Sequence, residues 1–351
     1  MTSFRIGNRD IGIDFSPYVI AEISANHAQD FDRAIALVDA AASSGVDAVK
    51  FQTYTPDTIT LVSDNEHFRL DTGTVWDGQT LHDLYAKAYT PWDWQPKLAA
   101  RALEHGIHWF SSPFDPTAVD FLETLDPPAY KVASFEIVDV GLLKAIAATG
   151  RPVIVSTGMA TLEEIDEAVS VLREAGSGEL ALLRTNSGYP AMPSEMDLSA
   201  IPAMAERYGV AIGLSDHTLA PNVPVVAVGL GASLIEKHLT LSREMETEDS
   251  KFSLEPAEFA AMVAAVREAH GAIGTPRFGP SPREEVSLKY RRSLFVARDV
   301  AAGEEFTAEN VRSVRPGTGM HTRHLDDVIG KTAAADVAAG TPMEWSLVAS
   351  E

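Results

Sequence analysis

Apolar and polar positions alternate with two different periods along the first 275 residues of the chain. Short runs of β-branched and other apolar residues, typical of buried strands, are each followed by a segment with the 3.6-residue period of an amphipathic helix. One such segment begins after Thr161, which we expect to cap the helix together with Glu164. Eight strand–helix units predict an α/β fold, the (β/α)8 or TIM barrel. The expected strands are 18–23, 48–53, 108–113, 129–134, 152–158, 180–185, 210–216 and 233–240.

A doubly wound open sheet is the alternative for such an alternation, but no G-x-G-x-x-G follows the first strand. Ahead of that strand, "FRIGNRDIGID" alternates about an Asn-Arg-Asp turn and predicts a small hairpin. After the last helix, "GTPRFGPSPREE" is rich in Pro, Gly and charge, as linkers are. We therefore predict a barrel domain with its hairpin over 1–274, a linker over 275–289 and a small second domain over 290–351.

Composition narrows the classes of partner and chemistry. The 351 residues carry 50 acidic and 28 basic side chains, a net charge of -22 that argues against nucleic acid and anionic membranes as partners. There is no cysteine, so a metal site must use His, Asp or Glu. The amino-terminal segment has no continuous apolar run, and no stretch is long enough to span a bilayer. A cytoplasmic protein is the simplest expectation.

Polar side chains gather where the predicted strands end. The carboxyl ends of all barrel strands meet at one face, where catalytic residues lie. A polar group that is buried without a partner costs about 1–3 kcal/mol, so this density favours a ligand site. The strand ends carry Glu22, Asn26, His27, Lys50, Gln52, Ser111, Ser112, Asp115, Lys131, Ser134, Glu136, Ser156, Thr157, Asn186, Ser187, Tyr189, Ser215, Asp216, His217, Glu236, Lys237 and His238.

Two histidines, His217 and His238, end sequence-adjacent strands in "GLSDHT" and "IEKHLT". Because these strands are neighbours in a barrel, the pair predicts one divalent cation with open positions for water and substrate. An oxygen-rich site suits Mn2+ or Mg2+. The alternative is that each imidazole only caps its own strand through a hydrogen bond.

Three lysines lie in apolar strands, where a lysine is seldom buried without an anion. Lys50, Lys131 and Lys237, with neighbouring hydroxyls, predict a phosphate or carboxylate site. The alternative is internal salt bridges to strand-end glutamates. Glu22 is a candidate general acid or base, or else orients a lysine or a metal-bound water. The residues alone thus predict metal-assisted chemistry on a small anionic substrate.

The motifs resemble those of the sialic acid synthase family. They are "AEISANH", "VKFQTYTPDTIT", "FSSPFD", "YKVASFEI", "STGMA", "GLSDHT", "IEKHLT" and "FSLEP", followed by "RRSLFVARDVAAGEEFTAENVRSVRPGTG". The resemblance implies a TIM barrel with a small antifreeze-like (SAF) domain and an enzyme that condenses phosphoenolpyruvate with an amino-sugar aldehyde, releasing phosphate by C–O cleavage. Within the family, "YTPDTIT" and "ISANH" are most similar to the pseudaminic acid branch, whose sugar is 2,4-diacetamido-2,4,6-trideoxy-altrose.

The resemblance also implies roles for individual residues. Catalytic residues would be Glu22, Lys50, Glu136, His217 and His238, with the two histidines as metal ligands. Phosphoenolpyruvate would be bound by Lys131, Ser134, Ser156, Thr157, Ser187 and Ser215. The sugar would be bound by Gln52, Tyr54, Asp115, Asn186, Tyr189 and Asp249, with the choice between Asn186 and Ser187 left open. Arg315 of the partner subunit would complete the sugar site in a domain-swapped homodimer.

Other functions fit parts of the same pattern. N-acetylneuraminate and legionaminate synthases would share the mechanism and differ in the sugar. A metal-dependent aldolase that cleaves such sugars would release pyruvate rather than phosphate. A non-catalytic carbohydrate- or ice-binding protein could use the antifreeze-like module, but "RDVAAGEEFTAENVR" is too charged for the flat, weakly charged face that ice binding needs.

Overall fold

The computed structural model describes residues 4–71, 73 and 77–350. The chain divides into two compact units, Met1–Gly274 and Thr275–Glu351. Each unit has its own hydrophobic core and is described by itself.

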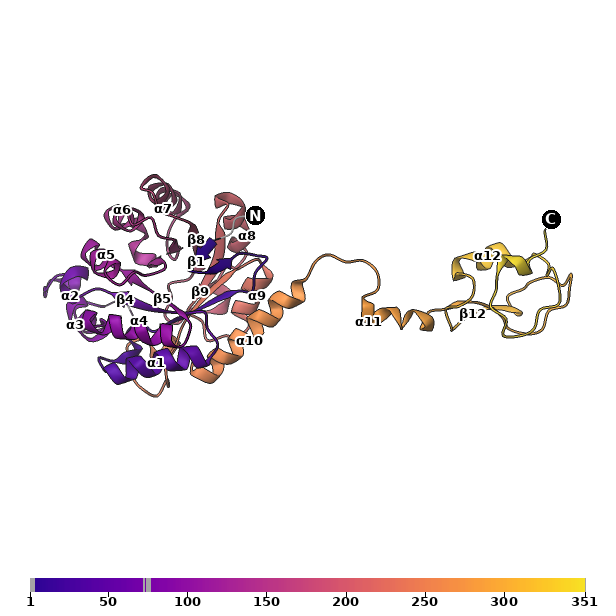
Figure 1. The fold of residues 1–351 in the computed structure, drawn as a ribbon, viewed down its shortest axis with the longest axis horizontal. Helices are drawn as coiled ribbons and strands as arrows, with labels where there is room; N and C mark the ends of the chain where they lie inside the picture. The colour runs from indigo at the N-terminus through magenta and orange to yellow at the C-terminus, as the bar shows by residue number, and fades with distance from the viewer. Residues whose placement is uncertain (1–3, 72, 74–76, 351) are drawn as a thin grey trace. The chain divides into compact units, whose positions relative to one another are not determined.

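Eight parallel strands close into a barrel in the first unit (Figure 1). Each strand pairs with the next along the chain, and β10 closes the ring by pairing with β3. This confirms the TIM barrel that the sequence predicts. The strands are β3 (Tyr18–Glu22), β4 (Ala48–Thr53), β5 (His108–Pro113), β6 (Tyr130–Val132), β7 (Val153–Ser156), β8 (Leu180–Thr185), β9 (Ala211–Asp216) and β10 (Leu234–His238).

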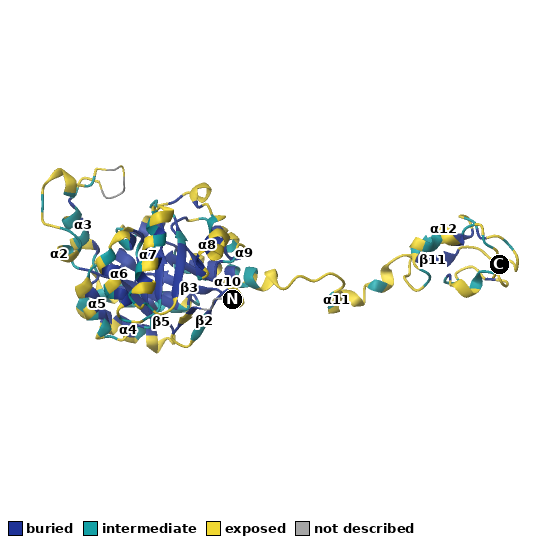
Figure 2. Cartoon of the chain, turned by 90° about the horizontal axis from the view of Figure 1, so that it is seen from above, coloured by how far each residue is buried: buried dark blue, intermediate teal, exposed yellow. Residues whose placement is uncertain are grey.

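Helices surround the barrel and bury their apolar stripes against it, while their outer faces are exposed (Figure 2). The expected cap forms at Thr161, whose hydroxyl accepts from the Glu164 amide while the Glu164 carboxylate accepts from the Thr161 amide. The helices are α1 (Phe31–Ser43), α4 (Gln95–Glu104), α5 (Pro116–Glu123), α6 (Val140–Ala147), α7 (Leu162–Glu174), α8 (Ala200–Tyr208), α9 (Val223–Gly229) and α10 (Pro256–Ile273).

Short 3-10 turns lie in several connections of the barrel. Strand β6 ends earlier than expected because the chain enters such a turn, η4 (Ser134–Val138). Four of the other turns follow strands on the carboxyl side of the barrel, and η3 precedes α4. They are η1 (Ser24–His27), η2 (Glu66–Phe68), η3 (Trp92–Trp94), η5 (Pro193–Glu195) and η6 (Ser250–Phe252).

Side chains alternate between the inside and the outside of the barrel along each strand. In the lower barrel the inward positions are apolar, and they pack with the amino-terminal hairpin of β1 (Phe4–Ile6) and β2 (Arg9–Ile11). Gly213 is required there, because a Cβ would lie 2.5 Å from the Leu234 carbonyl oxygen. Within the described part of the barrel, apolar side chains therefore fill the amino-terminal end, and the cavity of the interior lies at the carboxyl ends.

The connection between β4 and α4 is long and carries two further helices, α2 (Pro56–Ile59) and α3 (Leu81–Ala88). Helix α3 begins after Thr80, whose hydroxyl accepts a hydrogen bond from the Asp83 amide at 3.1 Å. Before it, the Leu70 amide donates to the Gln79 carbonyl at 3.0 Å. These contacts order the segment internally, and several of its side chains line the same cavity as the strand-end polar residues.

The second unit is built around a small apolar core that includes Leu294, Phe306 and Met343. Strands β11 (Ser293–Val296) and β12 (Val311–Val314) pair antiparallel within it. Its remaining elements are α11 (Pro282–Glu285), η7 (Leu288–Tyr290), η8 (Thr322–His324), α12 (Leu325–Val328) and η9 (Trp345–Leu347).

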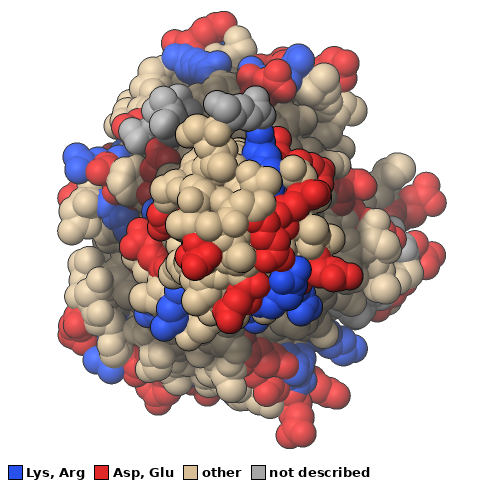
Figure 3. Space-filling model, turned by 90° about the vertical axis from the view of Figure 1, so that its right-hand side faces the viewer, with Lys and Arg blue, Asp and Glu red and all other residues tan. Residues whose placement is uncertain are grey.

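The surface reflects the acidic composition. On the face drawn in Figure 3, Lys and Arg side chains lie scattered among Asp and Glu side chains. Among the residues that the structure describes, no helix combines the length and the apolar character that a bilayer crossing needs.

Candidate active site

A cavity of about 570 Å3 opens at the carboxyl ends of the barrel strands. Most of the predicted site residues line it, although they come from every part of the barrel. They are brought together because parallel strands all end at one face. The predicted residues on its wall are Glu22, Lys50, Gln52, Tyr54, Lys131, Ser134, Glu136, Ser156, Ser187, Tyr189, Ser215, His217, His238 and Asp249.

Three barrel residues that the resemblance assigns to substrate binding do not line the cavity, because their side chains have local partners. The Thr157 hydroxyl donates to the Leu183 carbonyl at 3.0 Å. Asp115 caps α5 and accepts from the Thr117 amide at 2.7 Å. Asn186 donates to the Glu195 carbonyl, and its side-chain oxygen accepts from the Gly188 amide. Between Asn186 and Ser187, it is therefore the serine that reaches the cavity. Arg315 lies in the second unit.

The two histidines lie side by side on the wall, with ring centroids 5.3 Å apart. His217 Nδ1 donates to the Asn186 carbonyl at 2.7 Å, so its Nε2 keeps a lone pair. Burial lowers the pKa of His217 to about 4 and that of His238 well below its usual value, so both rings are neutral at pH 7. His238 Nδ1 has no hydrogen-bond partner. Neutral imidazoles with free lone pairs have the chemistry of metal ligands.

No third protein ligand joins this pair in the described part of the chain, where no group of three His, Asp or Glu side chains is arranged to hold a metal ion. The nearest carboxylate oxygen to His238 Nδ1 belongs to Asp249, at 3.9 Å. A divalent ion on the two histidines would therefore keep most of its coordination positions for water and substrate.

Lys50 links two carboxylates on the cavity wall. Its Nζ lies 2.6 Å from Glu236 Oε1 and 2.9 Å from Glu22 Oε2, and the second contact is an ion pair without hydrogen-bond geometry. Burial lowers the pKa of Lys50 to about 7 despite the opposing charge of Glu236, and the neighbouring Lys131 adds to the lowering. Burial alone would raise the pKa of Glu236, but Lys131 and Lys50 outweigh it and hold that pKa at about 2. Glu236 is thus ionised and fixes both lysines.

Lys131 lies farther from Glu236 than Lys50 does, since its Nζ is 3.5 Å from Glu236 Oε1. It is buried and lines the cavity, which makes it the lysine best placed to meet an anion. Lys237 does not join this site, and the expectation of three lysines there is wrong. It alternates with Glu236 and His238 along β10, so it faces outward and pairs with Asp216 at 2.5 Å.

Serine hydroxyls from β7, β9 and two connections line the same part of the wall. Ser156 Oγ and Ser187 Oγ are buried and have no hydrogen-bond partner. Gly158 allows this close packing, because a Cβ there would lie 2.3 Å from Ser187 Oγ and 2.7 Å from Ser134 Oγ. Eight buried side-chain atoms among the described residues lack a hydrogen bond, and six of them belong to the cavity wall: those of Glu22, Glu136, Ser156, Ser187, Glu236 and His238. The Glu22 atom is the one that forms the ion pair with Lys50. A polar ligand is the natural partner for them.

Glu136 follows β6 in η4 and carries one of these unpaired oxygens, Oε2. Burial raises the pKa of its carboxyl to about 7, and the charge of Lys131 only partly opposes this. A carboxyl with that pKa can both give and take a proton near neutral pH.

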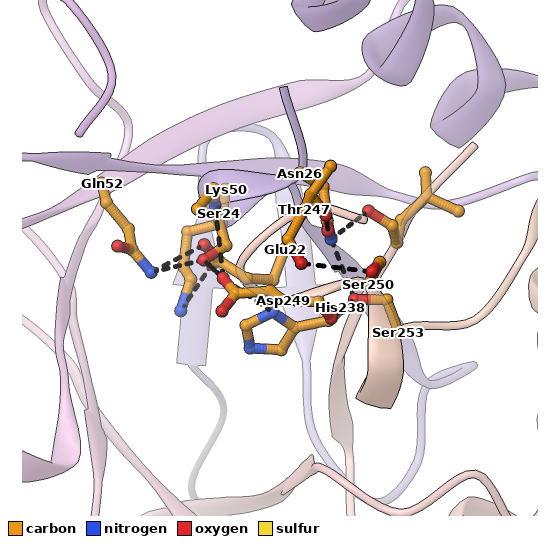
Figure 4. A network of polar contacts seen from close by, with 12 residues as sticks. Glu22, Ser24, Asn26, Lys50, Gln52, His238, Thr247, Asp249, Ser250 and Ser253 are labelled. Carbon is orange, nitrogen blue, oxygen red and sulfur yellow. Dashed lines mark hydrogen bonds and ion pairs between the residues drawn. The ribbon is translucent and has the colours of Figure 1, made fainter. Parts of the chain in front are cut away.

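A chain of polar contacts connects β3, β4 and the loop after β10 (Figure 4). Gln52 Nε2 donates to Glu22 Oε1 at 3.2 Å and to Ser24 Oγ at 3.1 Å, and Ser24 in turn donates to Asp249. Asn26 fastens the same loop: its Nδ2 donates to the Leu239 carbonyl and to Ser253 Oγ. The loop that carries Asp249 is therefore held in place from the end of β3.

Comparison with known proteins places this site in a family. A model of the NeuB family matches residues 37–277, which is more than half of the chain. The chain belongs to the NeuB family. A model of the SAF domain matches residues 291–349 of this NeuB protein. Both matches confirm the resemblance drawn from the motifs, including the carboxyl-terminal antifreeze-like module.

Individual relatives match nearly the whole NeuB protein. A protein named pseudaminic acid synthase from Campylobacter jejuni is 43% identical over 345 residues, covering 97% of this chain and 99% of the relative. One of the same name from Helicobacter pylori is 41% identical, covering 93% and 96%. A solved structure of an N-acetylneuraminic acid synthetase from Leptospira borgpetersenii, in complex with citrate, has a TM-score of 0.73 and 30% identity, covering 83% and 96%.

Sequence reasoning missed part of the wall of this NeuB protein. Ser24 was not singled out, and the signal for it is only its place in "ISANH". Glu236 is among the listed strand-end residues, but the sequence assigns it no individual role other than pairing with lysines, and it also lines the cavity. The largest omission is the apolar part of the wall in the β4–α4 connection: Ile59, Leu70, Leu81, Leu84, Tyr85 and Ala88. Leu81, Leu84, Tyr85 and Ala88 have helical spacing, which normally indicates a core-facing stripe.

Proposed function

We propose that this protein is a pseudaminic acid synthase. It joins C3 of phosphoenolpyruvate to the aldehyde carbon of 2,4-diacetamido-2,4,6-trideoxy-altrose, and a water adds at C2 of the phosphoenolpyruvate part. The tetrahedral species then breaks its C–O bond to phosphate, so the products are pseudaminic acid and inorganic phosphate. The observation that carries the proposal is 43% and 41% identity, over nearly the whole chain, to two proteins that bear this name.

The polar part of the cavity suits an anion of this kind. We assign the phosphate and carboxylate of phosphoenolpyruvate to Lys131 and to the hydroxyls of Ser134, Ser156, Ser187 and Ser215. Support comes from the unpaired hydroxyls of Ser156 and Ser187 and from the loose contact of Lys131 with Glu236. Hydrogen bonds from these donors to an anion are of the charge-assisted, stronger kind.

Two proton movements accompany the reaction. The former aldehyde oxygen must gain a proton, and the water that adds at C2 must lose one. We assign proton handling to Glu22 and Glu136, which line the same cavity. The pKa of about 7 suits Glu136 to either direction of transfer, whereas Glu22 lies beside Lys50 and within reach of Gln52.

We further propose that His217 and His238 hold Mn2+ or Mg2+. The neutral rings, the hydrogen bond that fixes His217 and the unpaired Nδ1 of His238 fit this role. When bound there, the ion would supply Lewis-acid polarisation of the aldehyde. Lys50, Gln52, Tyr54, Tyr189 and Asp249 line the same space and are assigned to orienting the sugar.

The direct test is phosphate release from phosphoenolpyruvate by metal-stripped protein to which Mn2+ is restored. The sugars to compare are the 6-deoxy diacetamido-altrose, N-acetylmannosamine, the diacetamido precursor of legionaminic acid, and none. Release that requires both Mn2+ and the altrose sugar is expected. Release with one of the other sugars would keep the mechanism and change the branch, and no release with any sugar would contradict synthase activity.

The oligomer is a separate proposal. We propose that the protein forms a domain-swapped homodimer in the cytoplasm, in which Arg315 of the partner subunit contacts the sugar. The support is the SAF match over residues 291–349, the part that contains this arginine. Mixing inactive His217→Ala and Arg315→Ala proteins, after unfolding and refolding together, should restore part of the activity. A mixture that stays inactive while both proteins refold as dimers would contradict the exchange.

A further inference from the structure

One face of α3 is apolar and turns toward the cavity. Leu81, Leu84, Tyr85 and Ala88 follow one another at the i, i+3, i+4 and i+7 positions of this helix, and all four line the cavity. Leu84 and Ala88 are buried, yet neither belongs to the hydrophobic cores of the protein. A stripe of this kind usually packs on a core, and here it packs on the space that the ligand occupies.

Two neighbours extend this surface. Ile59 ends α2, and Leu70 is held beside the start of α3 by the backbone pairing between 69–70 and 78–80. We call these six residues the α3 wall: Ile59, Leu70, Leu81, Leu84, Tyr85 and Ala88. Beside Tyr85 lies Tyr54, with ring centroids 5.6 Å apart, and Tyr54 in turn packs on Phe114 at 5.0 Å. All three rings line the cavity, so the α3 wall continues into packed aromatic rings.

In strand order, the α3 wall lies across the barrel from the serine hydroxyls of β7 to β9 in the proposed anion site, whereas Lys131 and Ser134 come from β6 and the turn after it, between the two. It belongs to the connection after β4, and in the closed order of strands β8 is four positions from β4 in either direction. The hydroxyls of Ser156, Ser187 and Ser215 come from β7, the segment after β8, and β9. A sugar whose aldehyde meets phosphoenolpyruvate on the β7–β9 side must extend its far end toward the β4 side.

The α3 wall has almost no side-chain atoms that could form a hydrogen bond with a hydroxyl group. Among its six residues the only polar side-chain atom is the Tyr85 oxygen. The unpaired buried polar atoms of the described cavity wall lie on other residues, from β3, β7, β10 and the segments after β6 and β8. Tyr85 lies near enough to Glu136 for that carboxyl, after burial, to help raise the tyrosine pKa, so the apolar contact is assigned to the leucines. A hydroxyl placed against Leu81 or Leu84 would lose its water without gaining a partner from these side chains, whereas a methyl group would gain apolar contact.

We propose that the α3 wall selects the sugar by its methyl groups, and so favours a 6-deoxy, N-acetylated sugar over its 6-hydroxy counterpart. This rests on the proposed function and assigns specificity to Leu81 and Leu84, the two wall leucines on α3. An apolar pocket rejects an analogue with one added hydroxyl by up to about 100-fold in kcat/KM. We expect the wild-type protein to prefer the 6-deoxy sugar by roughly 10- to 100-fold.

The test compares 2,4-diacetamido-2,4,6-trideoxy-altrose with 2,4-diacetamido-2,4-dideoxy-altrose, which differs only by the C6 hydroxyl, and measures phosphate release. Leu84→Asn and Leu81→Asn place an amide on the wall and keep the branching and the number of side-chain heavy atoms of leucine. Leu81 is only half-buried, so its variant guards against misfolding at the more buried Leu84. Leu103→Asn on α4 is the matched control, since Leu103 is 60% exposed and does not line the cavity.

The readout is the ratio of kcat/KM for the two sugars, in which the fraction of active enzyme cancels. Both wall variants should lower the ratio by about tenfold or more and leave the KM for phosphoenolpyruvate unchanged, and the control should keep the wild-type ratio. A wild-type ratio near one, or a ratio that neither wall variant moves, overturns the inference and leaves the synthase activity standing. An absence of release with either sugar would instead remove the proposed function and this inference with it.

Discussion

Replacing Ser156 with alanine should weaken phosphoenolpyruvate binding without harming the fold. Ser156 ends β7 with its side chain inside the barrel, and its hydroxyl is buried on the cavity wall. In the ligand-free protein this oxygen has no hydrogen-bond partner. The substitution therefore removes no hydrogen bond within the protein, and we expect the hydroxyl to donate a hydrogen bond when an anion binds.

The size of both effects follows from this arrangement. A buried unpaired polar group costs about 1–3 kcal/mol, so removing it should leave the free energy of unfolding unchanged or raise it by up to that amount. A hydrogen bond to a charged group contributes about 1.5–3 kcal/mol. Its loss corresponds to a rise of roughly 10- to 150-fold in the Kd for phosphoenolpyruvate. The two changes have opposite signs, which distinguishes them from general damage.

Ser112 provides a matched control within the same barrel. It lies on β5, it is also buried, and its hydroxyl is also unpaired, but it does not line the cavity. Ser112→Ala should change stability in the same direction as Ser156→Ala and leave phosphoenolpyruvate binding unchanged. Isothermal titration with phosphoenolpyruvate and urea unfolding of ligand-free protein measure the two quantities on each variant.

Two results would refute this reasoning. If Ser156→Ala binds phosphoenolpyruvate within about twofold of the wild type, the hydroxyl does not contact the anion. If Ser112→Ala weakens binding as much as Ser156→Ala does, the effect travels through repacking of the barrel interior. In either case the unpaired hydroxyls would not be a guide to the anion site.

Three further changes test other parts of the site. Because burial raises the pKa of Glu136 to about 7, the folded protein holds this proton more tightly than the unfolded chain does, and its free energy of unfolding should fall as the pH rises from 4.5 to about 7. In urea unfolding, Glu136→Gln should not show this pH-dependent fall. Its pH–rate profile should also lack the limb near pH 7. His217→Ala should lose Mn2+ binding in isothermal titration, because it removes one of two imidazole ligands. Lys237→Met should lower the free energy of unfolding by about 3–5 kcal/mol, since it leaves the buried Asp216 carboxylate without its ion-pair partner. Adding Asp216→Leu should recover most of the lost stability. Neither change should alter phosphoenolpyruvate binding.

The barrel could be predicted because its strands are simple in sequence. All eight expected strands form, and three of them, β4, β5 and β8, have the expected bounds. The others are one to three residues shorter, mainly at their ends, where the chain turns into a loop or a 3-10 segment. Periodicity reports which side chains are buried, but backbone hydrogen bonds decide where pairing stops, and these depend on the neighbouring strands.

The polar half of the site was also largely predictable. Strand ends converge on one face of a barrel, so listing the polar residues there selects the residues of a single cavity. The exceptions are physical rather than random. Lys237 faces outward because it alternates with two inward residues, whereas Asp115 caps a helix and Thr157 donates to a neighbouring backbone carbonyl. Sequence places a residue at a strand end, but its rotamer and nearest acceptor decide whether it meets the ligand.

The apolar part of the cavity wall could not be predicted, because an apolar stripe on a helix usually indicates that the helix packs on a hydrophobic core. The stripe of Leu81, Leu84, Tyr85 and Ala88 has the period by which core-facing helices are recognised, and a helix buried on a core gives the same pattern. What distinguishes α3 is that its stripe faces an open cavity, across from the β7–β9 strands that we propose bind the anion, which depends on topology and not on spacing. If the sugar's methyl groups pack on that stripe, the substrate replaces the hydrophobic core on which such a helix usually packs. The specificity of the site would then depend on a hydrophobic contact that forms only when the correct sugar binds.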